Sequence, residues 1–317
     1  MNDVLPPPDV PDLPADRHRE LKGAFMLMIS DQPRPRTARR RWAFVLVPAF
    51  AVVVAVAAIG AVTLRSPEIH GSPAPIIAIE PGSAAEVGPL VNRLALAAAG
   101  KPSTPVSSGQ YVYIRSKVAW LVFEKDLAES GGSQSAGEDP MMLDEVHSRE
   151  IWVPATAGDE GRIRERGDTF GLQGARPNSY YAGLPTDPKA LLAKIYAASG
   201  TGDLDKDDMA YDYVGETLRE SILPPELLAA LYRAAAQIPG VVIVKDAVDA
   251  AGRHGVAVAR TDAQGERTEW IFDPQTFDYL GERSYLVRKT DIGPAGMLTA
   301  TTAVLERAVV NKKGRTP

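Results

Sequence analysis

The chain has 317 residues, of which 45% are hydrophobic and 24% are charged, and its formal net charge is −5. These are ordinary values for a globular protein, so most of the chain is expected to fold, and the negative charge argues against nucleic acid as a partner. The sequence contains no cysteine, which excludes disulfides, thiolate zinc sites, iron–sulfur clusters and a cysteine nucleophile, and we expect no cofactor.

Residues 1–41 precede the first long apolar run and are expected to form a cytoplasmic tail. The tail begins with a proline-rich stretch that favours an extended chain. A short helix can follow from Asp16, and it would place Leu21, Phe25 and Met28 on one side. Too little chain surrounds this apolar stripe to form a core. We therefore predict that it lies on the membrane surface or docks on a partner.

Residues 42–64 form an uncharged apolar run that predicts a transmembrane helix. About 23 residues at 1.5 Å each span roughly 34 Å, enough for a hydrocarbon core of about 30 Å. A cleaved signal peptide fits less well because the run is long and starts far into the chain. A lipoprotein would need a cysteine for lipid attachment, and the chain has none. By the positive-inside rule the N-terminus is cytoplasmic, because five arginines precede the run: Arg34, Arg36, Arg39, Arg40 and Arg41.

A linker rich in proline, glycine and serine is predicted at 65–82, followed by a domain outside the membrane at 83–317. Ser83 is expected to cap a helix that ends before Gly100. Strands are then predicted at 110–123, 145–154 and 161–167, with a Ser/Gly-rich loop at about 128–140.

The pattern changes at Asp187, which with the proline after it predicts the start of a helix. Two more helices are predicted at 209–220 and 225–237. Five further strands are expected, with the sequence DPQT forming a hairpin turn: 241–247, 254–261, 267–273, 277–288 and 298–310. Runs of strands with few alternating helices indicate an antiparallel α+β domain rather than a doubly wound sheet.

One group of side chains suggests a binding surface. On one face of the first long strand, and on one face of a later strand, aromatic and basic residues alternate: Tyr111, Tyr113, Arg115 and Lys117, then Arg162, Arg164 and Arg166. If these faces coincide, the sheet has a surface able to bind anions or a polar polymer. The alternative is that the alternating polar residues mark a solvated sheet face.

No catalytic or metal site is predicted. The four histidines, His18, His70, His147 and His254, lie far apart, whereas a metal site usually draws ligands from short spacings. The acidic segment at 203–214 lacks the glycine and glutamate of a calcium loop, so we expect a solvated loop before a helix. No G-x-S-x-G motif is present. The chain is therefore expected not to be an enzyme.

Several stretches between residues 105 and 285 resemble a family of actinobacterial single-pass membrane proteins often encoded beside extracytoplasmic-function sigma factors. They include YVYIRSK, REIWVPATAGDEGRIR, LPTDPKALLAKI, DAAGRHGVAVAR and WIFDPQTFDYLGER. The resemblance implies a membrane-anchored extracytoplasmic module with no established activity. More distantly, the order of elements is similar to lipoprotein-carrier and sigma-regulator domains, in which a half-barrel sheet folds over helices. Zinc-type anti-sigma domains use a His/Cys cluster in the cytoplasmic tail. In this tail His18 stands alone and there is no cysteine, so the resemblance does not extend to that zinc mechanism.

Two functions follow as hypotheses. In the first, the outer domain senses or binds something in the cell envelope while the tail contacts a cytoplasmic sigma factor. In the second, the chain is an anchored module that binds an envelope lipid or another ligand, and the tail is only a membrane anchor.

Overall fold

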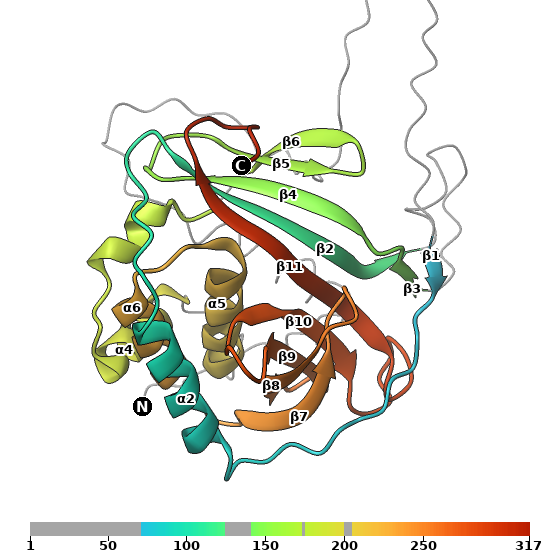
Figure 1. Ribbon diagram of the computed structural model, residues 1–317. Coiled ribbons are helices and arrows are strands. Elements are labelled where there is room, and N and C mark those ends of the chain that lie inside the picture. The colour runs from blue at the N-terminus through green and yellow to red at the C-terminus, as the bar shows by residue number, and fades with distance from the viewer. Residues whose placement is uncertain (1–70, 124–140, 173–174, 200–204) are drawn as a thin grey trace, which may run out of the picture.

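The computed structural model describes residues 71–123, 141–172, 175–199 and 205–317 (Figure 1). The predicted tail with Leu21, Phe25 and Met28, and the predicted transmembrane segment 42–64, lie outside these ranges. Among the residues that are described, no helix is both long and apolar enough to cross a membrane.

The described part of the chain is built on one antiparallel sheet (Figure 1). Its main path runs β6-β5-β4-β2-β11-β10-β9-β8-β7. The strands of its first half are β2 (Tyr111–Phe123), β4 (His147–Pro154), β5 (Gly161–Glu165) and β6 (Asp168–Leu172). Those of its second half are β7 (Val242–Val248), β8 (His254–Thr261), β9 (Glu266–Phe272), β10 (Tyr279–Leu286) and β11 (Leu298–Val310). The two halves meet where β2 pairs with β11, so segments from opposite ends of the domain lie side by side.

Two short strands, β1 (Gly71–Pro73) and β3 (Met141–Asp144), pair with each other, and β3 also pairs with β2. The residues after β1 belong to the stretch expected as a linker. Here Ile77 donates its backbone N–H to the carbonyl of Gly296 at 2.8 Å, and its side chain packs on a small apolar cluster around Tyr285. The described part of this stretch, residues 71–82, therefore lies against the sheet.

The described residues form four α-helices on one side of the curved sheet (Figure 1): α2 (Val87–Ala99), α4 (Pro188–Ala198), α5 (Lys206–Glu220) and α6 (Pro225–Ala235). A 3-10 helix, η1 (Asn178–Gly183), precedes α4. The largest apolar cluster joins residues of these helices, such as Leu94 and Leu231, to sheet residues such as Trp270 and Phe272. On β2, Val112 and Ile114 face this side and are buried. The predicted antiparallel α+β fold is confirmed.

Local sequence signals explain where the helices begin. Asp187 caps α4 as predicted, because its side chain accepts from the backbone N–H of Ala190 at 2.8 Å. Asp205 caps α5 in the same way, so the acidic segment begins a helix. The prediction for Ser83 was wrong. Ser83 exchanges two backbone hydrogen bonds with Ile243 of β7, and α2 begins only at Val87.

Candidate functional site

Helix α5 is fixed to the sheet by Tyr211. Its ring stacks on the indole of Trp270 in β9, with centroids 3.8 Å apart and planes 11° apart. Its hydroxyl donates to the carbonyl oxygens of Val258 at 2.9 Å and Thr268 at 3.1 Å. Both rings are buried, so the contact combines apolar burial with hydrogen bonds to otherwise buried carbonyls.

One turn further along α5, Gly215 allows the helix to approach the sheet closely. A Cβ atom at this position would lie 2.8 Å from Nε1 of Trp270 and 3.0 Å from Oε2 of Glu282. Both distances are too short for an ordinary carbon contact. A glycine inside a helix costs stability relative to alanine, and here the close approach gives a physical reason for it.

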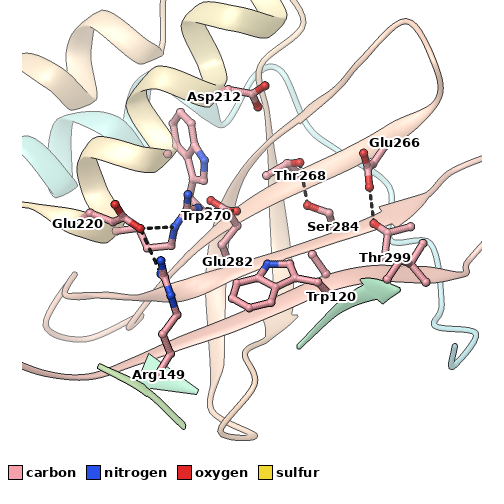
Figure 2. A pocket seen from close by; sticks show the side chains of 14 residues that line it. Trp120, Arg149, Asp212, Glu220, Glu266, Thr268, Trp270, Glu282, Ser284 and Thr299 are labelled. Atoms are coloured by element: carbon pink, nitrogen blue, oxygen red, sulfur yellow. Dashed lines mark hydrogen bonds and ion pairs between the residues drawn. The ribbon is translucent and has the colours of Figure 1, made fainter. Parts of the chain in front are cut away.

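A cavity of about 430 Å³ opens beside Gly215, between α5 and strands β2, β9, β10 and β11 (Figure 2). This volume lies within the range of small-molecule sites in proteins. At about 30 Å³ per water, it has room for roughly fourteen water-sized groups.

The cavity wall is rich in charge, and acidic groups outnumber basic ones. Its carboxylates are those of Asp212, Glu220, Glu266 and Glu282, and its guanidinium groups are those of Arg149 and Arg219. Four negative charges against two positive charges give the lining a formal net charge of −2. This balance disfavours an anionic ligand and favours a neutral or cationic one.

Both cations of the wall are held in ion pairs. Arg149 lies 3.2 Å from an oxygen of Glu220 (Figure 2). Arg219 lies 3.0 Å from an oxygen of Glu282. Burial acts to lower the pKa of Arg219, but the charges of Glu282 and Glu220 more than offset it and raise that pKa. The guanidinium group of Arg219 therefore stays charged, and its ion pair with Glu282 links α5 to β10.

The remaining wall offers aromatic and hydroxyl groups. Trp120 is half-buried, with the guanidinium carbon of Arg149 5.9 Å from its ring centroid. Thr268 and Ser284 share a hydrogen bond of 2.9 Å between their hydroxyls. The indole N–H of Trp270 has no hydrogen-bond acceptor within the described ranges. A buried donor without an acceptor is uncommon, and a ligand with an acceptor atom would satisfy it.

His147 lies next to this wall, in edge contact with Trp120. One ring nitrogen lies 2.6 Å from a carboxylate oxygen of Glu165, and the other lies 2.8 Å from the carbonyl oxygen of Glu145. Burial acts to lower the pKa of His147, but hydrogen bonds to Asp144 and Glu165 more than offset it and raise the pKa to about 9. The imidazole is therefore charged at neutral pH.

The predicted tyrosine and arginine surface forms on the opposite face of the sheet. The strand register aligns Tyr113 with Trp152 and Arg162, and it aligns Arg115 with Glu150 and Arg164. The two strand faces therefore coincide, as the binding hypothesis requires. Arg166 does not lie on this shared face. It lies beyond the end of β5 in a left-handed backbone conformation with φ of 52° and pairs with Asp144.

Two of the four cations of this surface, Arg115 and Arg164, already have acidic partners. Arg115 lies 3.2 Å from Glu306, and Arg164 lies 2.9 Å from Glu150, which also accepts from the hydroxyl of Tyr113 at 2.6 Å. These pairs offset the positive charge that would attract an anion. Lys117 of the same surface is exposed. Anion or polymer binding at this face stays a prediction.

The C-terminal segment covers part of the same surface. The indole N–H of Trp152 donates to the carbonyl of Arg315 at 2.6 Å, and Arg164 donates to the carbonyl of Gly314 at 3.3 Å. Tyr113 is only 1% exposed as a result of this packing. At the strand start, Tyr111 is half-buried.

No metal centre is evident in the described residues, where no group of three histidine or carboxylate side chains is placed to hold an ion. The cavity itself was not predicted. Its residues come from β2, β4, α5, β9, β10 and β11, and only the fold brings them together. One feature of the local sequence pointed to this region: Gly215 is an isolated glycine within a helical pattern, which often marks a close packing contact.

No protein-family model matches the chain, and no curated protein sequence matches it. Solved structures of MucB are similar to it at low identity. The complex of MucA and MucB from Pseudomonas aeruginosa has 15% identity and a TM-score of 0.23, over 73% of this chain and 58% of that chain. A structure of MucB alone has 14% identity and a TM-score of 0.22, over 74% of this chain and 60% of that chain.

The match thus spans less than two thirds of the MucB chains. The chain has a distant structural similarity to MucB, and at this identity and TM-score the likeness carries no information on ligands or partners.

Proposed function

We propose that this chain is a membrane-anchored extracytoplasmic protein that binds a small ligand and has no catalytic activity. The observation that carries the proposal is the cavity of about 430 Å³ beneath α5. The anchor and the orientation rest on the apolar run 42–64 and on the arginines before it.

The wall chemistry defines the class of ligand. A net charge of −2 disfavours anions, and paired arginines leave little free positive charge for one. The ring of Trp120 suits the apolar face of a ligand, while hydroxyls and carboxylates suit its polar edge. We propose a neutral or cationic polar molecule of up to about fourteen non-hydrogen atoms.

Native mass spectrometry of the full-length chain, extracted from its own membrane, tests this proposal. We expect an added mass of a few hundred daltons at most. Ala300 lies on the cavity wall, so Ala300→Phe fills the space and should remove that mass. Ala99 is exposed at the end of α2, so Ala99→Phe is the matched control and should retain it. A wild-type spectrum without added mass, or one unchanged by Ala300→Phe, would contradict the proposal.

A second function concerns the tail. We propose that Leu21, Phe25 and Met28 bind a cytoplasmic sigma factor, on the basis of the apolar stripe and the family resemblance. The solved complexes pair MucB with MucA, but this proposal does not rest on them. Crosslinking in intact membranes should link Lys22 to a sigma factor, and Leu21→Asp with Phe25→Asp should abolish the link. Crosslinks confined to envelope components would leave the tail as an anchor only.

A further inference from the structure

A second cavity lies on the other side of α5, next to Arg307 of β11. Arg307 pairs with Ile114 in the strand register, so its side chain points toward the helices. One of its terminal nitrogens donates to the carbonyl of Leu218 near the end of α5. Its guanidinium carbon lies 5.5 Å from the ring centroid of Tyr279.

These contacts leave the cation of Arg307 without a counter-charge. It forms no ion pair with any carboxylate of the described residues, and its Nε atom is buried without a hydrogen-bond acceptor. The nearby Asp278 is paired with Lys101. Burial lowers the pKa of Arg307, and the neighbouring tyrosines and Asp278 only partly offset the effect. Arg307 is half-buried as a residue and its Nε atom is fully buried, and a cation removed from water without an ionic partner is unfavourable.

The cavity beside Arg307 has a volume of about 240 Å³. It lies between the end of α2, helices α5 and α6, and β11. Its walls are mostly apolar, with Leu218, Ile222 and Leu228 among them, and Lys101, which is paired with Asp278, lies at its edge. The lining contains no carboxylate. At about 30 Å³ per water-sized group, there is room for roughly eight such groups.

The two cavities therefore differ in charge and lie on different faces of one helix. Gly215 and Arg219 of α5 face the first cavity, whereas Thr217 and Leu218 face the second. The first has an acidic wall, and the second has a basic wall with apolar surroundings. They cannot serve the same class of ligand.

We propose that the cavity beside Arg307 binds a small organic carboxylate with a short apolar tail. A carboxylate can accept two hydrogen bonds from a guanidinium group and neutralise its charge, which no described residue does. The apolar walls then bury the tail, which removes its apolar surface from water. A chain of about six carbons fills the volume.

Isothermal titration calorimetry on the full-length chain in detergent tests this site with hexanoate and hexanamide. The two probes have nearly the same shape, but only hexanoate carries a negative charge at neutral pH. We expect saturable binding of hexanoate and at least tenfold weaker binding of hexanamide. Equal affinities for the two probes, or no saturable binding of hexanoate, would overturn the proposal.

Variants locate the site. Arg307→Met removes the charge and should weaken hexanoate binding at least tenfold. Arg288 is exposed, so Arg288→Met is the matched control and should bind as the wild type does. If Arg307→Met does not fold, Leu228→Trp fills the cavity from α6 and leaves Arg307 in place. Hexanoate binding that survives whichever of the two variants folds would place the site elsewhere and overturn the proposal.

Discussion

The phenol ring of Tyr211 lies flat against the indole of Trp270, 3.8 Å away between centroids, and its hydroxyl bonds two strand carbonyls. This contact sets the height of α5 above the sheet. Because Gly215 follows one turn later, the same contact also sets the depth of the acidic cavity. The acidic cavity therefore depends on how α5 packs on the sheet.

Removing the hydroxyl of Tyr211 should loosen that docking. Tyr211→Phe keeps the stacked ring but leaves the carbonyl oxygens of Val258 and Thr268 without this donor. We expect the free energy of unfolding to fall by about 1–2 kcal/mol, as measured by urea denaturation. Tyr111→Phe is the control, since Tyr111 is half-buried and its hydroxyl makes no hydrogen bond within the described ranges. An equal loss in both variants would contradict the role given to Tyr211.

Gly215 and Gly88 form a matched pair of helical glycines. Alanine usually stabilises a helix interior by about 0.5–1 kcal/mol relative to glycine. Gly88 lies in the first turn of α2, before Pro89, and has open space where a Cβ atom would stand, so Gly88→Ala should leave the stability nearly unchanged. Gly215→Ala should instead lower the melting temperature, because the new methyl group meets Trp270 and Glu282. A stabilising Gly215→Ala would show that α5 does not press on the sheet as described.

The charge state of His147 predicts a dependence of stability on pH. Its pKa in the folded chain is about 9, above the ordinary value of 6.5, so its contribution is complete below pH 6.5 and lost as pH rises through 9. The loss should amount to about 3 kcal/mol. His147→Gln should flatten the unfolding free energy between pH 6.5 and 9. A wild type and a variant with parallel pH profiles would exclude His147 as the cause.

Because the chain has no cysteine, its topology can be tested with single introduced thiols. In intact cells, a membrane-impermeant maleimide should label Lys117→Cys on the exposed sheet face. Lys22→Cys in the tail should react only after the membrane is opened. Labelling of Lys22→Cys in intact cells would reverse the predicted orientation.

Much of the fold could be predicted from local sequence signals. The period of two along β2 and the Asp187 cap with its proline correctly predicted a strand and a helix. Ser83 was predicted to be a cap because its side chain is of the right type, but the backbone of Ile243 offered it a strand partner instead. Ile243 is 160 residues away in the sequence, so the residues around Ser83 contain no signal that predicts this pairing.

The candidate site was harder to predict for the same reason. The sequence left open whether the strand faces that carry Arg115 and Arg164 coincide, and only the strand register shows that they do. Nothing in the sequence pattern indicated that Glu306 and Glu150 would neutralise these two arginines. The acidic cavity joins residues from six elements, and a pattern along one element cannot reveal it.

The indole N–H signals of the full-length chain, labelled with ¹⁵N-tryptophan, test the central claim most directly. Trp270 lines the cavity and its N–H has no acceptor among the described residues, whereas the N–H of Trp152 is bonded to Arg315. The spectrum should be recorded before and after addition of a polar extract of the cell envelope that holds both its neutral and its cationic small molecules. We predict that the Trp270 signal shifts while the Trp152 signal stays in place. Two unchanged signals, or equal shifts of both, would contradict a ligand site beneath α5.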